Sequence, residues 1–82
     1  MMAESVTRRA DRPENRCNVF VNGELKHIEC SLTVAGLIQH LSLPPDRIAV
    51  EVNKSIVRKR DWENTPVPDA AQIEIVEFVG GG

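Results

Sequence analysis

Aromatic residues are scarce in this chain of 82 residues, which has no tyrosine, one tryptophan and two phenylalanines. Proteins that bind single-stranded nucleic acid stack bases on exposed aromatic rings within a basic groove. The formal net charge of this chain is −2 at pH 7, and its basic run Arg58-Lys59-Arg60 is balanced by acids elsewhere. We therefore expect no nucleic acid partner, and we interpret the basic run as solvated charge rather than as a docking site.

Long apolar stretches are absent from the sequence as well. None approaches the roughly 20 residues that a membrane-spanning helix needs, so we expect no membrane partner. Arg8-Arg9 are not followed by the apolar segment of an export signal. Two cysteines are too few to predict a disulfide framework, and we therefore expect a reducing, cytoplasmic location.

The length of the chain suits one small domain with two short extensions. Residues 1–16 are polar and show no apolar periodicity, so we interpret them as a disordered N-terminal arm. Residues 17–79 contain all the strand and helix patterns and form the predicted domain. Residues 80–82 form a predicted flexible tail of glycines.

A β-hairpin is predicted at the start of the domain. Residues 17–21 alternate between apolar and polar side chains and lead into Asn22-Gly23, a dipeptide favoured in two-residue type I′ turns. The return strand is expected from Leu25 to Cys30. In this register Cys17 faces Ile28, and an apolar face forms on one side of the hairpin.

The cysteines and histidines are the candidates for a metal site. They show neither CxxC nor HxxxH spacing, and His27 is expected on the opposite hairpin face from Cys17 and Cys30, so we expect no zinc or other metal. The two cysteines are diagonal neighbours in the predicted register, roughly 7 Å or more apart, which disfavours a disulfide. We expect them to be small buried hydrophobic side chains instead.

A helix is predicted after the hairpin. Thr33 is a suitable N-cap, Leu32 before it can form a hydrophobic staple, and Gly36 is interpreted as permitting close packing on the sheet. The prolines at 44 and 45 prevent the helix from continuing. The apolar stripe of this helix is formed by Val34, Leu37, Ile38 and Leu41.

Three further strands are predicted at residues 48–52, 56–57 and 73–79, and the alternation in the first of them predicts that Ile48, Val50 and Val52 face inward. Trp62, in the intervening polar segment, is interpreted as a packing residue. The strand after the helix cannot be a hairpin neighbour of the strand before it, so we expect a mixed sheet. The fold class is therefore α+β, with four to five strands covered on one face by one helix.

The last three residues of the chain are glycines, Gly80, Gly81 and Gly82. Glycine has no Cβ and tolerates nearly any backbone conformation, so such a tail leaves the C-terminal carboxylate sterically bare. Three extended residues reach roughly 10 Å, enough to thread a carboxylate into the active site of another protein. The alternative interpretation is a frayed terminus.

From Cys17 onward, about four-fifths of the chain, the sequence resembles the sulfur carrier proteins of thiamine biosynthesis, a ubiquitin-like β-grasp family. Two segments depart from the usual pattern of that family: Arg58-Lys59 stands in place of Pro-Arg, and Asp69-Ala70-Ala71 in place of Asp-Gly-Asp. The resembling stretches are Val21–Glu24, Leu32–Ala35, Ile48–Asn53, Ile56-Val57 with Trp62, and Ile73–Val76 through Gly82.

The resemblance implies that this protein is a co-substrate and not an enzyme. An E1-like activating enzyme would adenylate the carboxylate of Gly82 with ATP, and sulfur from a persulfide donor would convert the adenylate to a thiocarboxylate. Thiazole synthase would then consume the sulfur. Gly81 is the second member of the required pair, and Gly80 is interpreted as a spacer. No cofactor is expected to be bound to the carrier itself.

Other functions remain open at this point. A related carrier could supply molybdopterin or cysteine synthesis through the same tail chemistry, and a ubiquitin-like interaction module could have an inert tail or one joined to other proteins by an isopeptide bond. Phe20, Val76 and Phe78 are expected on the helix-free sheet face close to the tail. They are candidates for docking the activating enzyme, with ordinary cross-strand packing as the alternative.

Overall fold

The computed structural model describes residues 16–78. The predicted arm therefore lies outside the described residues, except for Arg16, which begins the first strand, and the predicted tail at 80–82 lies outside them as well. The elements in chain order are β1 (Arg16–Val21), β2 (Glu24–Glu29), α2 (Val34–His40), η2 (Pro45–Arg47), β3 (Ile48–Val52), β4 (Ser55–Val57), η3 (Lys59–Asn64) and β5 (Gln72–Glu77).

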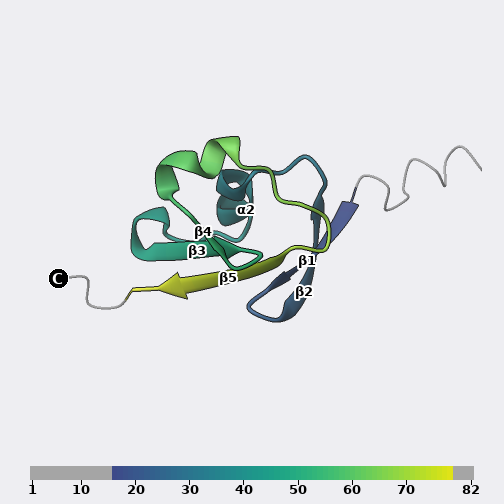
Figure 1. Ribbon diagram of the computed structural model, residues 1–82, viewed down its shortest axis with the longest axis horizontal. Helices are drawn as coiled ribbons and strands as arrows, with labels where there is room; N and C mark the ends of the chain where they lie inside the picture. Colours follow the sequence, from purple (N-terminus) through teal and green to yellow (C-terminus); the bar gives the residue numbers. More distant parts are fainter. Residues whose placement is uncertain (1–15, 79–82) are drawn as a thin grey trace, which may run out of the picture.

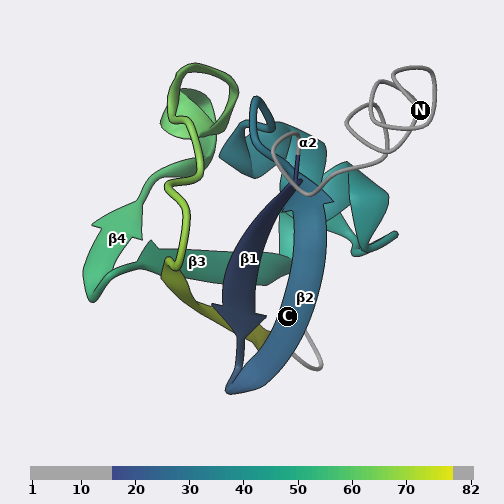
Figure 2. The same cartoon turned by 90° about the vertical axis from the view of Figure 1, so that its right-hand side faces the viewer.

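The five strands form one sheet in the order β2-β1-β5-β3-β4. β1 and β5 are parallel, and the other neighbouring pairs are antiparallel, so the predicted mixed sheet is confirmed. α2 covers one face of the sheet, and the short helical segment after β4 lies on the same side (Figures 1 and 2). The α+β class follows, with β5 as the central strand.

The first hairpin has the predicted register, including Cys17 opposite Ile28 and Val21 opposite Glu24. Asn22 has φ 52° and Gly23 has φ 85°, the left-handed values that a type I′ turn requires at both central residues. The sequence therefore specified this turn correctly through its Asn-Gly dipeptide.

The prediction of two unpaired, buried cysteines was wrong, because Cys17 and Cys30 form a disulfide with their Cα atoms 5.0 Å apart. The predicted return strand ran through Cys30, but β2 ends at Glu29 and the chain turns there, with the amide of Leu32 donating to the carbonyl of Glu29 at 3.1 Å. This turn brings Cys30 back beside Cys17. Cys17 is buried, whereas Cys30 is exposed.

The predicted helix cap at Thr33 is confirmed, since its hydroxyl accepts a hydrogen bond from the amide of Gly36 at 3.2 Å. The role expected for Gly36 is corrected: a Cβ there would lie 3.0 Å from the side chain of Leu32, so the glycine makes room for Leu32 over the first helical turn rather than for the sheet. The helix ends at His40, and Ser42 follows with φ 58°.

The core lies between α2 and the inner face of the sheet. Each predicted inward-facing residue of β3 is buried, and Val34, Leu37 and Ile38 of the helix stripe are buried against them. The core consists of Cys17, Val19, Val21, Ile28, Val34, Leu37, Ile38, Ile48, Val50, Val52, Trp62, Val67, Ala71 and Ile73.

A second hairpin joins β3 to β4 through Asn53 and Lys54, whose φ values are 52° and 73°. Trp62 in η3 closes the end of this hairpin, as predicted for a packing residue. Its side chain is 4% exposed, and its indole Nε1 donates to the carbonyl of Val57 at 2.9 Å. The hydrogen bond satisfies the one polar group of a buried ring.

The turn before β5 contains the departure from the family pattern at residues 69–71. Ala70 has φ 64°, a left-handed conformation that favours glycine, the residue common in the resembling family. Its amide donates to the carbonyl of Asn18 at 2.6 Å, and Asp69 accepts from the amide of Asn18 at 3.0 Å. Contacts with β1 therefore hold alanine in a strained conformation.

Candidate functional site

β5 is the strand that leads to the C-terminal glycines. Its pairing with β3 runs to Ile48 opposite Glu77, and the amide of Phe78 donates to the carbonyl of Arg47 at 2.6 Å. The described chain thus stays attached to the sheet up to Phe78, four residues before the C-terminus. Gly80, Gly81 and Gly82, the predicted reactive tail, lie outside the described residues.

The other edge of β5 is held differently. β1 pairs with it only at Phe20 opposite Gln72 and Val21 opposite Ile73. Beyond that point the side chain of Asn22 takes over: its Oδ1 accepts from the amide of Ile75 at 2.8 Å, and its Nδ2 donates to the carbonyl of Ile75 at 3.1 Å. Sequence reasoning identified Asn22 as a turn residue and missed this second contact.

The start of β5 has a similar contact with the second hairpin. The amide of Asn53 donates to the carbonyl of Gln72 at 2.7 Å, and Oδ1 of Asn53 accepts from the amide of Gln72 at 2.9 Å. β5 is therefore held at its first residue and again at Ile75 by asparagines at the first positions of two left-handed turns.

Two of the three predicted docking residues lie near the tail. Val76 points to the helix-free face and is 58% exposed, and Phe78, at the end of β5, is 52% exposed. Phe20 is half-buried and pairs with Gln72. Because four residues of a strand span about 13 Å, Phe20 lies well behind Val76 along the sheet.

The helix-free face carries further exposed side chains that sequence reasoning did not single out. Leu25 is opposite Phe20, Ile56 is opposite Glu51, and Glu51 is opposite Glu74. Leu25 is 49% and Ile56 is 73% exposed. The predicted register of the first hairpin places Leu25 outward, and the alternation of β4 places Ile56 outward. Both residues could therefore have been predicted from the sequence as exposed.

The basic run at 58–60 lies at the start of η3, and all three of its side chains are exposed. Lys59 forms an ion pair with Asp46 of η2. The hydrogen bond from Lys59, and then its positive charge, lower the pKa of the Asp46 carboxyl below its ordinary value. Lys59 therefore has a local partner within its own domain.

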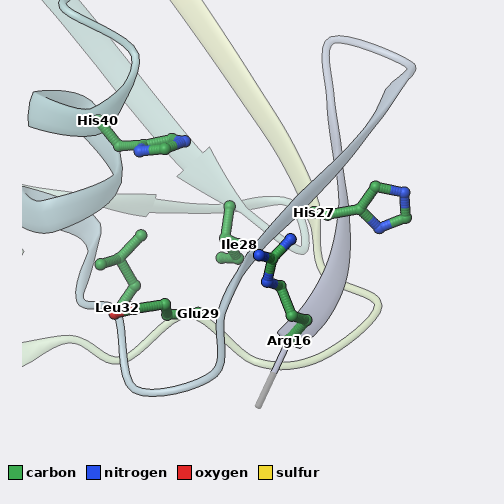
Figure 3. A pocket seen from close by; sticks show the side chains of 6 residues that line it. All are labelled: Arg16, His27, Ile28, Glu29, Leu32 and His40. Atoms are coloured by element: carbon green, nitrogen blue, oxygen red, sulfur yellow. The ribbon is translucent and has the colours of Figure 1, made fainter. Parts of the chain in front are cut away.

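A groove lies beside the start of β1, the end of β2 and α2 (Figure 3). His40 extends from α2 toward β2, whereas the ring of His27 points away from the helix (Figure 3), and Nδ1 of His27 lies 2.6 Å from Oδ1 of Asn18. The groove is lined by Arg16, His27, Ile28, Glu29, Leu32 and His40.

The described residues, 16–78, contain no group of three or more His, Cys, Asp or Glu side chains that could hold a metal ion. Cys17 and Cys30, two of the four residues considered for zinc, are joined to each other. Within the same part of the chain, no helix has the length and apolar character needed to cross a membrane.

A family model and a solved structure indicate the same family. A model described as the ThiS family matches residues 19–82. A thiazole synthase of Magnetococcus marinus is 36% identical over 64 residues, which are 78% of this chain and 20% of that protein. A thiazole synthase of Paramagnetospirillum magneticum is 39% identical over 64 residues, with the same two shares. This chain thus spans about a fifth of the length of these relatives.

A solved structure is similar over the whole domain. It is the crystal structure of a thiamine biosynthesis protein (ThiS) from Geobacter metallireducens, which matches with a TM-score of 0.70 and 29% identity. The match covers 79% of this chain and 99% of that protein. The similarity confirms the predicted β-grasp fold.

Proposed function

Because this chain belongs to the ThiS family of sulfur carrier proteins, we propose that it carries sulfur as a thiocarboxylate on Gly82. The observation that carries the proposal is the family match, which extends through the terminal glycines to residue 82. The carrier is a co-substrate. An E1-like adenylyltransferase activates it, and a second enzyme takes its sulfur.

The first step activates the terminal carboxylate. A carboxylate is a poor electrophile because its negative charge is delocalised over two oxygens. In the activating enzyme, an oxygen of Gly82 attacks the α-phosphorus of ATP, pyrophosphate leaves, and an acyl-adenylate forms. AMP is then a good leaving group at the carbonyl carbon. ATP is bound by the activating enzyme, and the carrier needs no cofactor of its own.

The second step introduces sulfur. The terminal sulfur of a cysteine persulfide attacks the carbonyl carbon of Gly82, and AMP leaves, so an acyl disulfide joins the carrier to the donor. A thiol then attacks the donor sulfur of this bond, which releases the thiocarboxylate and leaves a new disulfide on the donor side. The sulfur remains tethered to a protein, which raises its local concentration at the acceptor.

The geometry of β5 supports this role for the tail. The strand is paired with β3 up to Glu77, the amide of Phe78 donates to the carbonyl of Arg47 in η2, and Asn22 holds the other edge at Ile75. Four residues follow Phe78 in the sequence, and four extended residues span at most about 14 Å. Such a reach suits delivery of Gly82 into an active site while the domain stays outside. Gly81 and Gly80 supply the sterically bare approach that the activating enzyme needs.

The exposed apolar residues near the end of β5 support a docking surface for the activating enzyme. We assign Val76 and Phe78 to the part of this surface near the end of β5, and Phe20 to the part near the start of β5. Large apolar side chains on a polar background are typical of protein interfaces. Val76→Asp should raise KM for the carrier in the activation assay, whereas Ile56→Asp, on the edge strand β4, is the matched control. Equal effects of both substitutions would contradict the docking assignment.

The names of the relatives support thiazole synthase as the enzyme that accepts the sulfur. In two relatives named thiazole synthase, a region similar to this chain is part of the same polypeptide as a much longer sequence. A fused carrier and acceptor gain effective concentration, which indicates that the two parts act together. Synthesis of molybdopterin or cysteine would require a different acceptor, and that difference can be tested directly.

The location we propose is the cytoplasm, where ATP is available for activation. The sequence predicted this location because two cysteines suggested no disulfide, and the Cys17–Cys30 disulfide removes that reason. The need for ATP is now its support.

The test is an intact-mass measurement. The carrier is incubated with ATP, a persulfide donor, a thiol and an E1-like enzyme from the same cell, and replacement of one oxygen by sulfur is the expected change. Deleting Gly82 should abolish it. An unchanged mass with an activating enzyme that is shown to be competent on another carrier would overturn the proposal. Incubating the thiocarboxylate with thiazole synthase, and separately with acceptors of the other two pathways, then identifies the pathway.

A further inference from the structure

We propose that Asn22 is a positioning residue for activation of the tail, because its side chain fixes the course of β5 where the chain leaves the domain. The inference rests on the proposed function, since positioning matters only if the tail enters another active site. It comes from the contact between Asn22 and Ile75, which are 53 residues apart in the sequence.

The need for this contact follows from the topology. β1 turns away into β2 immediately after Val21, and the amide of Asn22 makes the last backbone hydrogen bond to β5, to the carbonyl of Ile73 at 2.8 Å. From Ile75 onward, no backbone of β1 is available to β5. Without another partner, this edge of the strand would be unpaired over its last three residues, and only β3 would hold it.

The side chain of Asn22 supplies that partner. A carboxamide has the same donor and acceptor groups as a peptide bond. Its Oδ1 and Nδ2 engage the amide and the carbonyl of Ile75 at 2.8 and 3.1 Å, both ordinary hydrogen-bond distances. The side chain therefore extends the β1–β5 ladder by one step, to a position three residues before Phe78.

The left-handed backbone of Asn22 makes this arrangement possible. Asparagine tolerates φ 52° better than most residues, so one side chain satisfies both the type I′ turn and the ladder contact. Glycine would keep the turn but could not reach Ile75. Aspartate would keep an acceptor for the amide of Ile75 but would lose the donor to its carbonyl.

Asn53 offers a matched control within the same chain. It has the same φ of 52°, occupies the same position of the second turn, and binds the same strand. Its contact is at Gln72, however, at the end of β5 far from the tail. Asn22→Gly removes two side-chain hydrogen bonds at Ile75, and Asn53→Gly removes one at Gln72, the first residue of β5, while both place glycine at the same turn position.

The experiment measures activation kinetics and amide exchange on the full chain. In Asn22→Gly we expect exchange of the Ile75 amide to become roughly 5- to 30-fold faster, as for loss of one to two modest hydrogen bonds. We expect kcat for adenylation to fall roughly fivefold with KM for the carrier little changed, because the body still docks while the tail is misdirected. Asn53→Gly should retain the kcat of the wild type.

Asn22→Asp provides a second variant if the glycine substitution impairs folding. It should lie between the wild type and Asn22→Gly in both readouts, because it retains the acceptor for the Ile75 amide. Equal kcat values for Asn22→Gly and Asn53→Gly, or a wild-type kcat for Asn22→Gly despite faster Ile75 exchange, would overturn this inference alone. A wild-type chain that gains no sulfur would overturn it together with the proposed function.

Discussion

The two β-hairpins of this domain have the same turn geometry but hold the central strand at different places. Each has an asparagine with φ 52° as its first turn residue, and each asparagine binds β5. Asn22 uses both polar atoms of its side chain on Ile75 near the tail, whereas Asn53 uses Oδ1 on Gln72 far from it. A dipeptide can thus fix a local turn while its role in function depends on where the turn meets the rest of the sheet.

The hairpins also differ in what closes their other ends. The first is closed by the Cys17–Cys30 disulfide, a covalent link with one exposed member. The second is closed by Trp62, which is buried and hydrogen-bonded to Val57, and by the exposed ion pair between Asp46 and Lys59. Burial and covalent closure are therefore expected to matter more to stability than the surface charges do.

The largest effect is expected at Trp62, in the closure of the second hairpin. Trp62→Ala should lower the free energy of unfolding by about 3–5 kcal/mol, the usual cost of removing a large buried ring. Urea denaturation followed by circular dichroism measures the loss, since the variant lacks the only tryptophan of the chain. Trp62→Phe is the control, because it keeps much of the packing and removes the hydrogen bond. If Trp62→Ala lowered the free energy of unfolding by less than the turn substitutions described below, burial of Trp62 would not be the main stabilising contact at this end of the hairpin.

The disulfide of the first hairpin is expected to have the next largest effect. Cys30→Ser removes the covalent link at an exposed position, and the loop that it closes has a length for which about 3 kcal/mol of stabilisation is expected. Urea denaturation of the oxidised protein, the reduced protein and the variant measures the difference. The reduced protein and the variant should agree. Equal stability of all three samples would show that the link does not constrain the unfolded chain.

A smaller effect is expected from exchanging the second turn residues. Gly23 has φ 85° with no atom within 4 Å of a Cβ placed there, and Lys54 has φ 73° at the equivalent position. Lys54→Gly should raise the free energy of unfolding by about 1 kcal/mol, and Gly23→Lys should lower it by a similar amount, since the left-handed conformation penalises a side chain. Thermal and urea unfolding measure both. Changes of the same sign would disprove the equivalence of the two turns.

The smallest effect is expected at the ion pair. The pKa of Asp46 is lowered from 3.8 by Lys59, so the pair stabilises the folded state above the unfolded pKa, and this contribution is lost as the pH falls through the folded pKa. An NMR titration of the Asp46 carboxyl should show a midpoint below 3.8 that rises in Lys59→Ala. No change in that midpoint would contradict the interaction. Between pH 5 and 8, Lys59→Ala should change the free energy of unfolding little, because both groups of the ion pair are exposed.

Much of the fold could be predicted because its signals are local. The Asn22-Gly23 dipeptide specified the turn and hence the register, and Thr33 specified the start of the helix. Alternation identified the inward residues of β3. These features depend on steric and hydrogen-bonding preferences of a few neighbouring residues, which act in the same way in any fold.

The failures came from places where the chain departs from regular structure. The disulfide was missed because a strand extended through Cys30 keeps the two cysteines on a diagonal, while the real strand ends one residue earlier and turns. The role of Gly36 was missed because its neighbour is Leu32, which folds back over the helix, and not the sheet. Strand ends and side-chain paths are set by tertiary contacts that no short pattern contains.

The sequence alone led to the chemistry that we propose for this protein, sulfur transfer at the carboxylate of Gly82, because such a proposal depends on covalent structure and not on the fold. It also determined the turns and the helix start, whose causes lie within a few residues. Only the tertiary structure decided that Asn22 reaches Ile75 and that Cys17 pairs with Cys30. Those outcomes depend on distances between segments of the chain that become neighbours only when the strands pair into one sheet with β5 at its centre.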